Sequence, residues 1–215
     1  MADMNNKKLI ILGCGGHARS VLDVVLYNNS KWNDVILVDE NANNGETMLG
    51  FPIIKAYDVN EEDVFVAIGN NDKRSTLSVK YYNNLVSIIS DRAYIGHSTN
   101  IGKGVFIAHN AHVGVLSQVN DFSLINTSAS VDHDCYIGKS CFIAPNATLC
   151  GKVHLGENVF IGAGATIIDS VRICDNVTIG AGAIIIKNIE KPGIYVGNPV
   201  KEKKLYNNRY SSKTN

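Results

Sequence analysis

Hydrophobic residues recur at every sixth position through the second half of the chain. Sixteen consecutive steps of six fall on isoleucine, leucine or valine, without an insertion or a deletion. The sixteen anchors are Ile95, Ile101, Ile107, Val113, Val119, Ile125, Val131, Ile137, Ile143, Leu149, Leu155, Ile161, Ile167, Ile173, Ile179 and Ile185. A strict period of this length predicts an all-β parallel β-helix, in which a single hexad has no core and stacking supplies one.

The hexads also predict the shape of each coil. Three hexads close one triangular coil, so residues eighteen apart stack at roughly 4.8 Å, and sixteen hexads make about five coils. A β-sandwich is disfavoured, because hairpin turns of varied length would break the register. We expect corners where glycine and asparagine recur, since both enter the left-handed backbone region at low cost. They stand three residues after the anchor in half of the hexads: Gly104, Asn110, Asn146, Asn158, Gly164, Asn176, Gly182 and Asn188.

The first part of the chain has a different pattern. A buried strand at 8–12 runs into a glycine-rich loop and then into a helix from His17 to Tyr27. Two more strands, at 35–38 and 64–68, and a helix at about 72–82 complete an α/β, Rossmann-like βαβ domain. We therefore divide the chain into a nucleotide-binding domain at 1–86, a β-helix at 87–190, and a C-terminal extension with a flexible tail at 191–215.

The glycine loop has the chemistry of a phosphate site. Gly13, Gly15 and Gly16 precede the helix, where free backbone N–H groups and the helix dipole favour an anion. With Ala18 and Asp39 the loop also matches a dinucleotide fingerprint, but about eighty-five residues provide only one mononucleotide half. A purely structural role, in which the glycines let the strand meet the helix, is the alternative.

Composition limits the partners. The chain has 215 residues, 45% of them apolar, and its 20 basic residues balance 20 acidic ones. Zero formal net charge argues against nucleic acid or an anionic membrane surface as a main partner. Five cysteines, an odd number, favour a reducing compartment. The apolar run after Lys8 is too short for a signal peptide, which needs about 7–15 apolar residues. We expect a cytoplasmic protein without membrane insertion.

The segment around Val131 carries the strongest candidate for catalysis. His133 and Asp134 are the third and fourth residues of their hexad, which places them at a corner. A histidine with a pKa near 6.5 can accept a proton at neutral pH, and a neighbouring carboxylate fixes its tautomer. Gly151 follows His133 by eighteen residues, so its backbone N–H is our candidate for an oxyanion contact. His97, His109, His112 and His154 are expected to be polar surface residues.

Unbroken tandem copies of [LIV]-[GA]-x-x-[STAV]-x resemble the hexapeptide-repeat acyltransferases, which implies a left-handed β-helix and a homotrimer with active sites between subunits. The segments Gly-Cys-Gly-Gly-His-Ala-Arg at 13–19, Val-Asp-Glu at 38–40 and Ile-Gly-Asn-Asn at 68–71 resemble the sugar acetyltransferases of surface-glycan pathways. These are the bacillosamine-type UDP-4-amino-sugar N-acetyltransferases and the sialic acid O-acetyltransferases. The resemblance runs from Lys8 to about Lys201.

This resemblance implies a role for individual residues. His133 would be the general base, oriented by Asp134, and Gly151 would meet the oxyanion. Phe142 stands where relatives often carry a second histidine near the acetyl group, a departure that puts the local geometry in doubt. The substrate would contact Gly15, Gly16, His17, Asp39, Glu40, Gly69 and Asn126, and acetyl-CoA would lie near Phe142, Ala163, Ala181 and Lys201, with no metal.

The leading hypothesis is an acetyl-CoA-dependent N-acetyltransferase that acts on a nucleotide-linked 4-amino-4,6-dideoxy sugar, with UDP as the expected nucleotide. The nearest alternative is O-acetylation of sialic acid. A trimeric zinc enzyme like the γ-class carbonic anhydrases would need His109, His112 and His133 as ligands, at a spacing that fits poorly. A non-catalytic scaffold is the remaining alternative.

Overall fold

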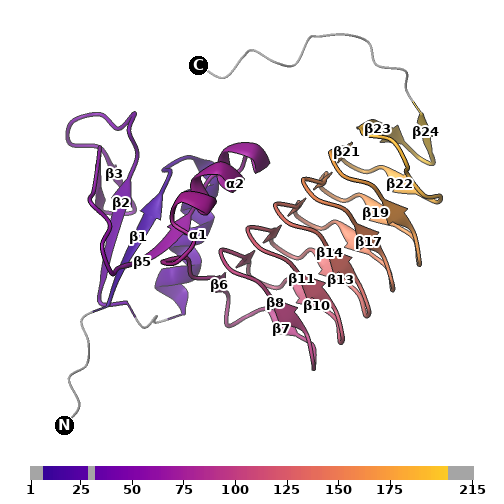
Figure 1. Ribbon diagram of the computed structural model, residues 1–215, viewed down its shortest axis with the longest axis horizontal. Helices are drawn as coiled ribbons and strands as arrows, with labels where there is room; N and C mark the ends of the chain where they lie inside the picture. Colours follow the sequence, from indigo (N-terminus) through magenta and orange to yellow (C-terminus); the bar gives the residue numbers. More distant parts are fainter. Residues whose placement is uncertain (1–6, 29–31, 203–215) are drawn as a thin grey trace.

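The protein consists of an α/β part followed by a long coil of short strands (Figure 1), as seen in a computed structural model that describes residues 7–28 and 32–202. The two parts lie end to end, with the second part extending away from the first. No helix in these ranges is long and apolar enough to cross a membrane.

The α/β part is built on a five-stranded sheet in the order β3-β4-β2-β1-β5. Strands β4, β2, β1 and β5 run parallel, and β3 pairs with β4 as an antiparallel hairpin. The βαβ unit is as predicted, whereas the hairpin was missed, because two strands this short show no clear alternation. The elements are β1 (Lys8–Leu12), α1 (Gly16–Tyr27), β2 (Asp34–Val38), β3 (Thr47–Met48), β4 (Phe51–Ile54), β5 (Asp63–Val66) and α2 (Asn71–Lys80).

The predicted parallel β-helix is confirmed, and it has three sheets, one for each side of the triangular coil. Sheet I contains β7 (Tyr94–Ile95), β10 (His112–Val113), β13 (Ser130–Val131), β16 (Thr148–Leu149), β19 (Thr166–Ile167) and β22 (Ile184–Ile185). Sheet II contains β8 (Asn100–Ile101), β11 (Gln118–Val119), β14 (Tyr136–Ile137), β17 (His154–Leu155) and β20 (Arg172–Ile173). Sheet III contains β6 (Ile88–Ile89), β9 (Phe106–Ile107), β12 (Leu124–Ile125), β15 (Phe142–Ile143), β18 (Phe160–Ile161), β21 (Val177–Ile179), β23 (Gly193–Gly197) and β24 (Val200–Glu202).

Neighbouring strands pair in a register of eighteen residues. Val131 of β13, for example, lies between Val113 and Leu149. The anchors from Ile107 onward are buried and form one continuous core, so each coil buries the apolar face of the next.

Left-handed backbone occurs at more corners than the positions of glycine and asparagine alone predicted. Leu116, Phe122 and Asp134 have φ values of 60°, 63° and 56°. A leucine or phenylalanine pays a steric cost in this region. Because the coils above and below impose one repeat length, the corner conformation is kept whatever residue stands there.

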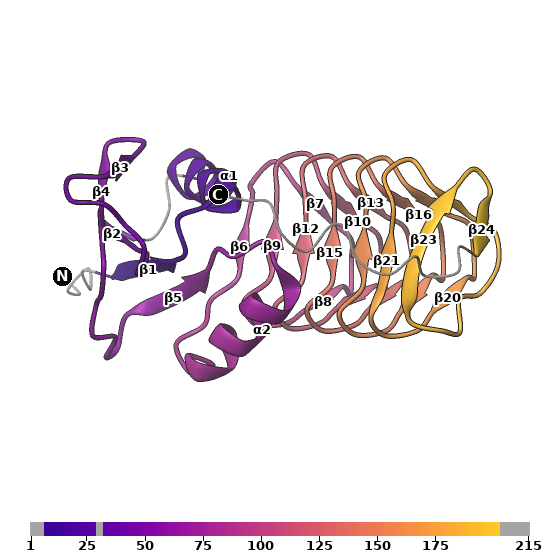
Figure 2. The same cartoon turned by 90° about the horizontal axis from the view of Figure 1, so that it is seen from above.

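Both helices of the α/β part lie beside the first coils (Figure 2). Phe106 and Leu124, which point outward from sheet III, are buried together with α1 and β1 in a second hydrophobic cluster. This cluster seals the first part onto one side of the β-helix. At the other end, β23 extends sheet III and turns back into β24.

Candidate active site

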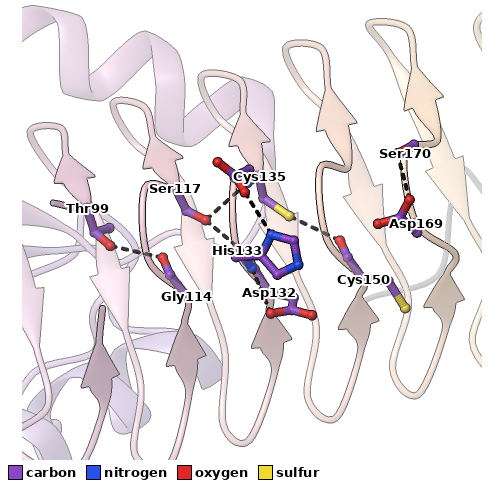
Figure 3. A network of polar contacts seen from close by, with 10 residues as sticks. Thr99, Gly114, Ser117, Asp132, His133, Cys135, Cys150, Asp169 and Ser170 are labelled. Carbon is purple, nitrogen blue, oxygen red and sulfur yellow. Dashed lines mark hydrogen bonds and ion pairs between the residues drawn. The ribbon is translucent and has the colours of Figure 1, made fainter. Parts of the chain in front are cut away.

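His133 and Asp134 lie at the corner between β13 of sheet I and β14 of sheet II. Asp134 takes the left-handed conformation, which turns its carboxylate toward the preceding ring, and Oδ2 lies 2.7 Å from His133 Nδ1. The two side chains are 44% and 42% exposed. Figure 3 shows the ring standing outward at this corner, with Asp132 below it. The corner residues are therefore available to a substrate.

The hydrogen bond to Asp134 raises the pKa of His133, and the charges of Asp132 and Asp134 act in the same direction. Partial burial of the ring and the charge of Lys152 oppose this effect. Because Asp134 occupies Nδ1, the neutral ring carries its proton there and leaves the Nε2 lone pair free. A general base requires such an arrangement, with a lone pair free to accept a proton.

Gly151 lies directly against this ring. A Cβ atom added to Gly151 would lie 2.6 Å from both Nε2 and Cε1 of His133, so only glycine permits the present ring position. The Gly151 N–H donates to no oxygen among the residues that the structure describes. The expected stacking of Gly151 on His133 is thus observed, and the free N–H remains a candidate oxyanion contact.

A buried serine behind the corner was missed by sequence reasoning. Ser117 Oγ donates to the carbonyl of Asp132 at 2.8 Å and accepts from the N–H of Cys135 at 3.1 Å. It therefore ties together the residues on either side of His133 and Asp134 (Figure 3). The only signal in the sequence is a serine at the inward hexad position, where alanine and valine are more usual in this chain.

A cavity of about 740 Å³ opens at the carboxyl ends of β1, β2, β4 and β5. This edge is where parallel α/β sheets bind ligands. Among the residues that line it are six of the predicted substrate residues, namely Gly15, Gly16, His17, Asp39, Glu40 and Gly69. Sequence reasoning missed other residues of its lining, from the end of β4 and from α2: Lys55, Tyr57, Lys73, Lys80 and Tyr81.

Asp39 supports the glycine loop. Its Oδ2 accepts the N–H of Cys14 at 2.9 Å, and its Oδ1 accepts the N–H of Asn41 at 3.0 Å. Burial would raise the pKa of this carboxyl, but the hydrogen bonds outweigh burial and lower it. Asp39 is therefore ionised at neutral pH and holds the loop in shape.

His17 is enclosed where α1 meets sheet III. Its ring lies 5.0 Å from that of Phe106 and 6.4 Å from that of Phe142, and its Nε2 has no hydrogen-bond partner among the described residues. Burial, assisted by the charge of Arg74, lowers the pKa of His17 to about 4. The ring is accordingly neutral at physiological pH.

The remaining predicted residues lie away from His133 within one chain. Asn126, Ala163 and Ala181 follow strands of sheet III, at the corner between sheets III and I. Phe142 points outward from sheet III and packs on Phe160, with ring centroids 5.1 Å apart. Lys201 lies in β24, where its backbone pairs with Val196, at the far end of the molecule.

The three histidines that the zinc alternative needs, His109, His112 and His133, do not form one cluster among the described residues. His109 Nδ1 lies 2.6 Å from Ser90 Oγ and its Nε2 lies 3.2 Å from Asp23 Oδ2, which ties α1 to the first coil. His112 stacks on Tyr94 with ring centroids 4.8 Å apart. Among the residues described, no cluster of three or more histidine, cysteine or acidic side chains could hold a metal.

A nucleotide-type α/β domain joined to a hexad β-helix with a histidine at one corner defines a hexapeptide-repeat transferase. Two family models match the chain: the PglD N-terminal domain at residues 8–81 and the bacterial transferase hexapeptide model, six repeats, at residues 152–187. Together with the solved relatives below, they show that the chain belongs to the hexapeptide-repeat sugar N-acetyltransferases.

Two solved relatives cover nearly the whole chain. The acetyltransferase domain of PglB from Neisseria gonorrhoeae is 30% identical, with a TM-score of 0.87 over 91% of this chain and 99% of that domain; it has also been solved in complex with acetyl coenzyme A. PerB from Caulobacter crescentus, solved with CoA and GDP-perosamine, is 30% identical, with a TM-score of 0.82 over 92% of this chain and 97% of PerB.

One curated relative is the uncharacterized protein L142 of Acanthamoeba polyphaga mimivirus. It is 34% identical over 119 residues, which are 53% of this chain. The chain covers only 24% of the length of that protein.

Proposed function

We propose that the protein transfers an acetyl group from acetyl-CoA to the amino group of a nucleotide-linked 4-amino-4,6-dideoxy sugar in surface-glycan biosynthesis. The observation that carries this proposal is the His133–Asp134 pair, held at an exposed corner with Nε2 free and with Gly151 against the ring. The complexes of the PglB domain with acetyl coenzyme A and of PerB with CoA and GDP-perosamine support the choice of substrates.

The chemistry follows from the positions of these groups. His133 Nε2 takes a proton from the acceptor amine while the amine nitrogen forms its bond to the acetyl carbon. The Gly151 N–H faces the oxygen that becomes negative, and its hydrogen bond is strongest at that moment. As the carbon–sulfur bond breaks, the imidazolium returns the proton to the thiolate. Asp134 stabilises the imidazolium throughout.

We further propose a homotrimer in which the site is shared. The cavity that contains Gly15 and Asp39 has no lining residue from the corner of His133, so one chain does not bring its own nucleotide pocket to its own base. In a closed ring of three chains the corner of one copy can face the pocket of the next. Asn126, Phe142, Ala163, Ala181 and Lys201 would then contribute from a neighbouring copy.

The test is turnover with defined acceptors. Purified protein is incubated with acetyl-CoA and, in parallel, UDP-, GDP- and dTDP-linked 4-amino-4,6-dideoxy sugars and free sialic acid, while thiol release and product mass are followed. We expect acetylation at nitrogen of one nucleotide sugar, with the UDP sugar as the first candidate. Turnover of sialic acid alone would establish the O-acetyl alternative and refute the proposal.

The same assay tests the base. We expect His133→Ala to lose about 10²–10⁴-fold in kcat/KM, the usual contribution of a general base. His97→Ala is the matched control, because His97 is an exposed histidine at the same corner of the β-helix, two coils before His133. A fully active His133→Ala variant would favour a scaffold role for the corner.

A further inference from the structure

Arg74 is fully buried where the two parts of the protein meet. Its guanidinium makes six hydrogen bonds, and five of the acceptors are backbone carbonyl oxygens. Nε donates to Phe122 O at 2.7 Å; Nη1 donates to Ile68 O and Gly69 O, both at 3.1 Å; Nη2 donates to Asn71 Oδ1 at 2.7 Å, Ser140 O at 3.1 Å and Cys141 O at 3.3 Å.

This cation has no carboxylate partner among the described residues. Burial lowers the pKa of Arg74 to about 10, so the side chain still carries its charge at neutral pH. A buried charge is expensive unless every donor is satisfied. The planar fork of arginine can reach carbonyls on three sides at once, whereas the ammonium of lysine has three donors at one point.

The acceptors of Arg74 belong to two structures that are distant in sequence. Ile68 and Gly69 lie in the turn between β5 and α2, Asn71 is the first residue of α2, and Gly69 lines the cavity. Phe122 and the pair Ser140 and Cys141 lie at the corner between sheets II and III, in two successive coils. Arg74 thus fixes the turn to the β-helix.

The helix α2 is a wall between the cavity and the β-helix. Lys73, Leu77 and Lys80 face the cavity. On the other side, Asp72 Oδ1 accepts from Asn158 Nδ2 at 2.9 Å, one coil beyond the contacts of Arg74. The position of the cavity wall therefore depends on how α2 is held against the coils.

We propose that Arg74 is a positioning residue for the acceptor, which sets the Gly69 turn and α2 relative to the β-helix so that a bound nucleotide sugar presents its amine at the correct depth. This inference rests on the proposed function. Arg74 touches neither substrate in this scheme, and its effect is transmitted through the cavity wall.

A positioning role has a kinetic signature. A displacement of the acceptor of about 1 Å costs on the order of 10²-fold, so we expect Arg74→Lys to lower kcat/KM for the nucleotide sugar by about 10–10²-fold. The KM for acetyl-CoA should stay unchanged. A residue that only stabilises the fold would lower the amount of active protein and leave both KM values as they are.

The experiment compares Arg74→Lys with Arg92→Lys, in which the exposed guanidinium that lies 5.5 Å from the Tyr27 ring is changed in the same way. Both KM values are measured, and binding of UDP, GDP and dTDP is measured by calorimetry. We expect weaker nucleotide binding and a higher nucleotide-sugar KM only in Arg74→Lys. Unchanged values in a folded Arg74→Lys protein would overturn the inference.

Two further results separate the inference from the proposed function. Wild-type protein that binds a nucleoside diphosphate but acetylates no sugar refutes the function, and the binding comparison still tests Arg74. If Arg74→Lys does not fold, the side-chain Nε–H of Arg74 is followed by NMR in arginine-labelled wild-type protein. We expect this slowly exchanging proton to shift when the nucleotide binds, and an unchanged resonance under saturation overturns the inference.

Discussion

Replacing Gly151 by alanine places a methyl group where the His133 ring now lies. The new Cβ would be 2.6 Å from Nε2 and from Cε1, and 3.1 Å from Asp169 Oδ1. Carbon and nitrogen atoms do not approach to 2.6 Å without a bond, so the ring must move. Since the imidazole is the free end of an exposed side chain, the ring will swing away while the backbone stays in place.

The magnitude follows from what the ring loses. Rotation of His133 breaks its 2.7 Å contact with Asp134 and removes Nε2 from its place beside Gly151. Loss of the alignment between base and oxyanion contact costs about 10²–10³-fold in kcat. The thermal midpoint should barely change, because Gly151 does not need left-handed backbone and alanine suits its conformation.

The pH dependence of kcat/KM gives an independent test of whether the His133 ring has moved. The hydrogen bond to Asp134 raises the pKa of His133, so the acid limb of kcat/KM in the wild type lies above the ordinary histidine value. Without that bond the pKa falls, and the acid limb of Gly151→Ala moves to lower pH.

The assay is the initial rate of thiol release from pH 5 to 9, with the melting temperature as the control for folding. If Gly151→Ala keeps the kcat of the wild type and the acid limb of its pH profile does not move, the assignment of this corner as the reaction site is refuted.

Two other predictions test the assembly and the buried histidine. Chains with His133→Ala should be inactive, and so should chains with Gly15→Asp, whose added carboxylate would repel a phosphate. When the two variants are co-expressed and assort at random, about a quarter of the subunit interfaces should combine an intact base with an intact cavity and regain activity. Absence of any recovery would argue for sites within single chains. His17 has a folded pKa of about 4, below its unfolded value, so its contribution to stability is present above pH 6.5 and is lost as the pH falls toward 4. The free energy of unfolding in urea, measured at pH 7.5 and at 4.5, should therefore fall less in His17→Phe than in the wild type. An equal fall in both proteins would contradict the lowered pKa of His17.

Much of the site was predictable because the β-helix converts spacing into position. An uninterrupted period of six determines which residues stack above one another, so the spacing of eighteen residues alone places Gly151 one coil beyond His133. The glycine loop was equally readable, because strand, loop and helix follow each other within thirty residues and six predicted residues line the same cavity.

Other features have no local signal. Arg74 reads as an ordinary charged helical residue, yet its acceptors include Phe122, Ser140 and Cys141, which are 48 to 67 residues away. Lys55 and Tyr57 line the cavity because they follow β4, which runs parallel to β2 at this edge of the sheet; the sequence showed neither β4 nor its pairing.

By itself, then, the sequence determined the contents of each column, because a repeat of constant length leaves a stacked coil no freedom in register. The tertiary structure alone decided which side of the β-helix the α/β part covers. It docked the α/β part against sheet III. That docking depends on apolar surface buried between segments far apart in the chain, and no periodicity within either segment encodes it.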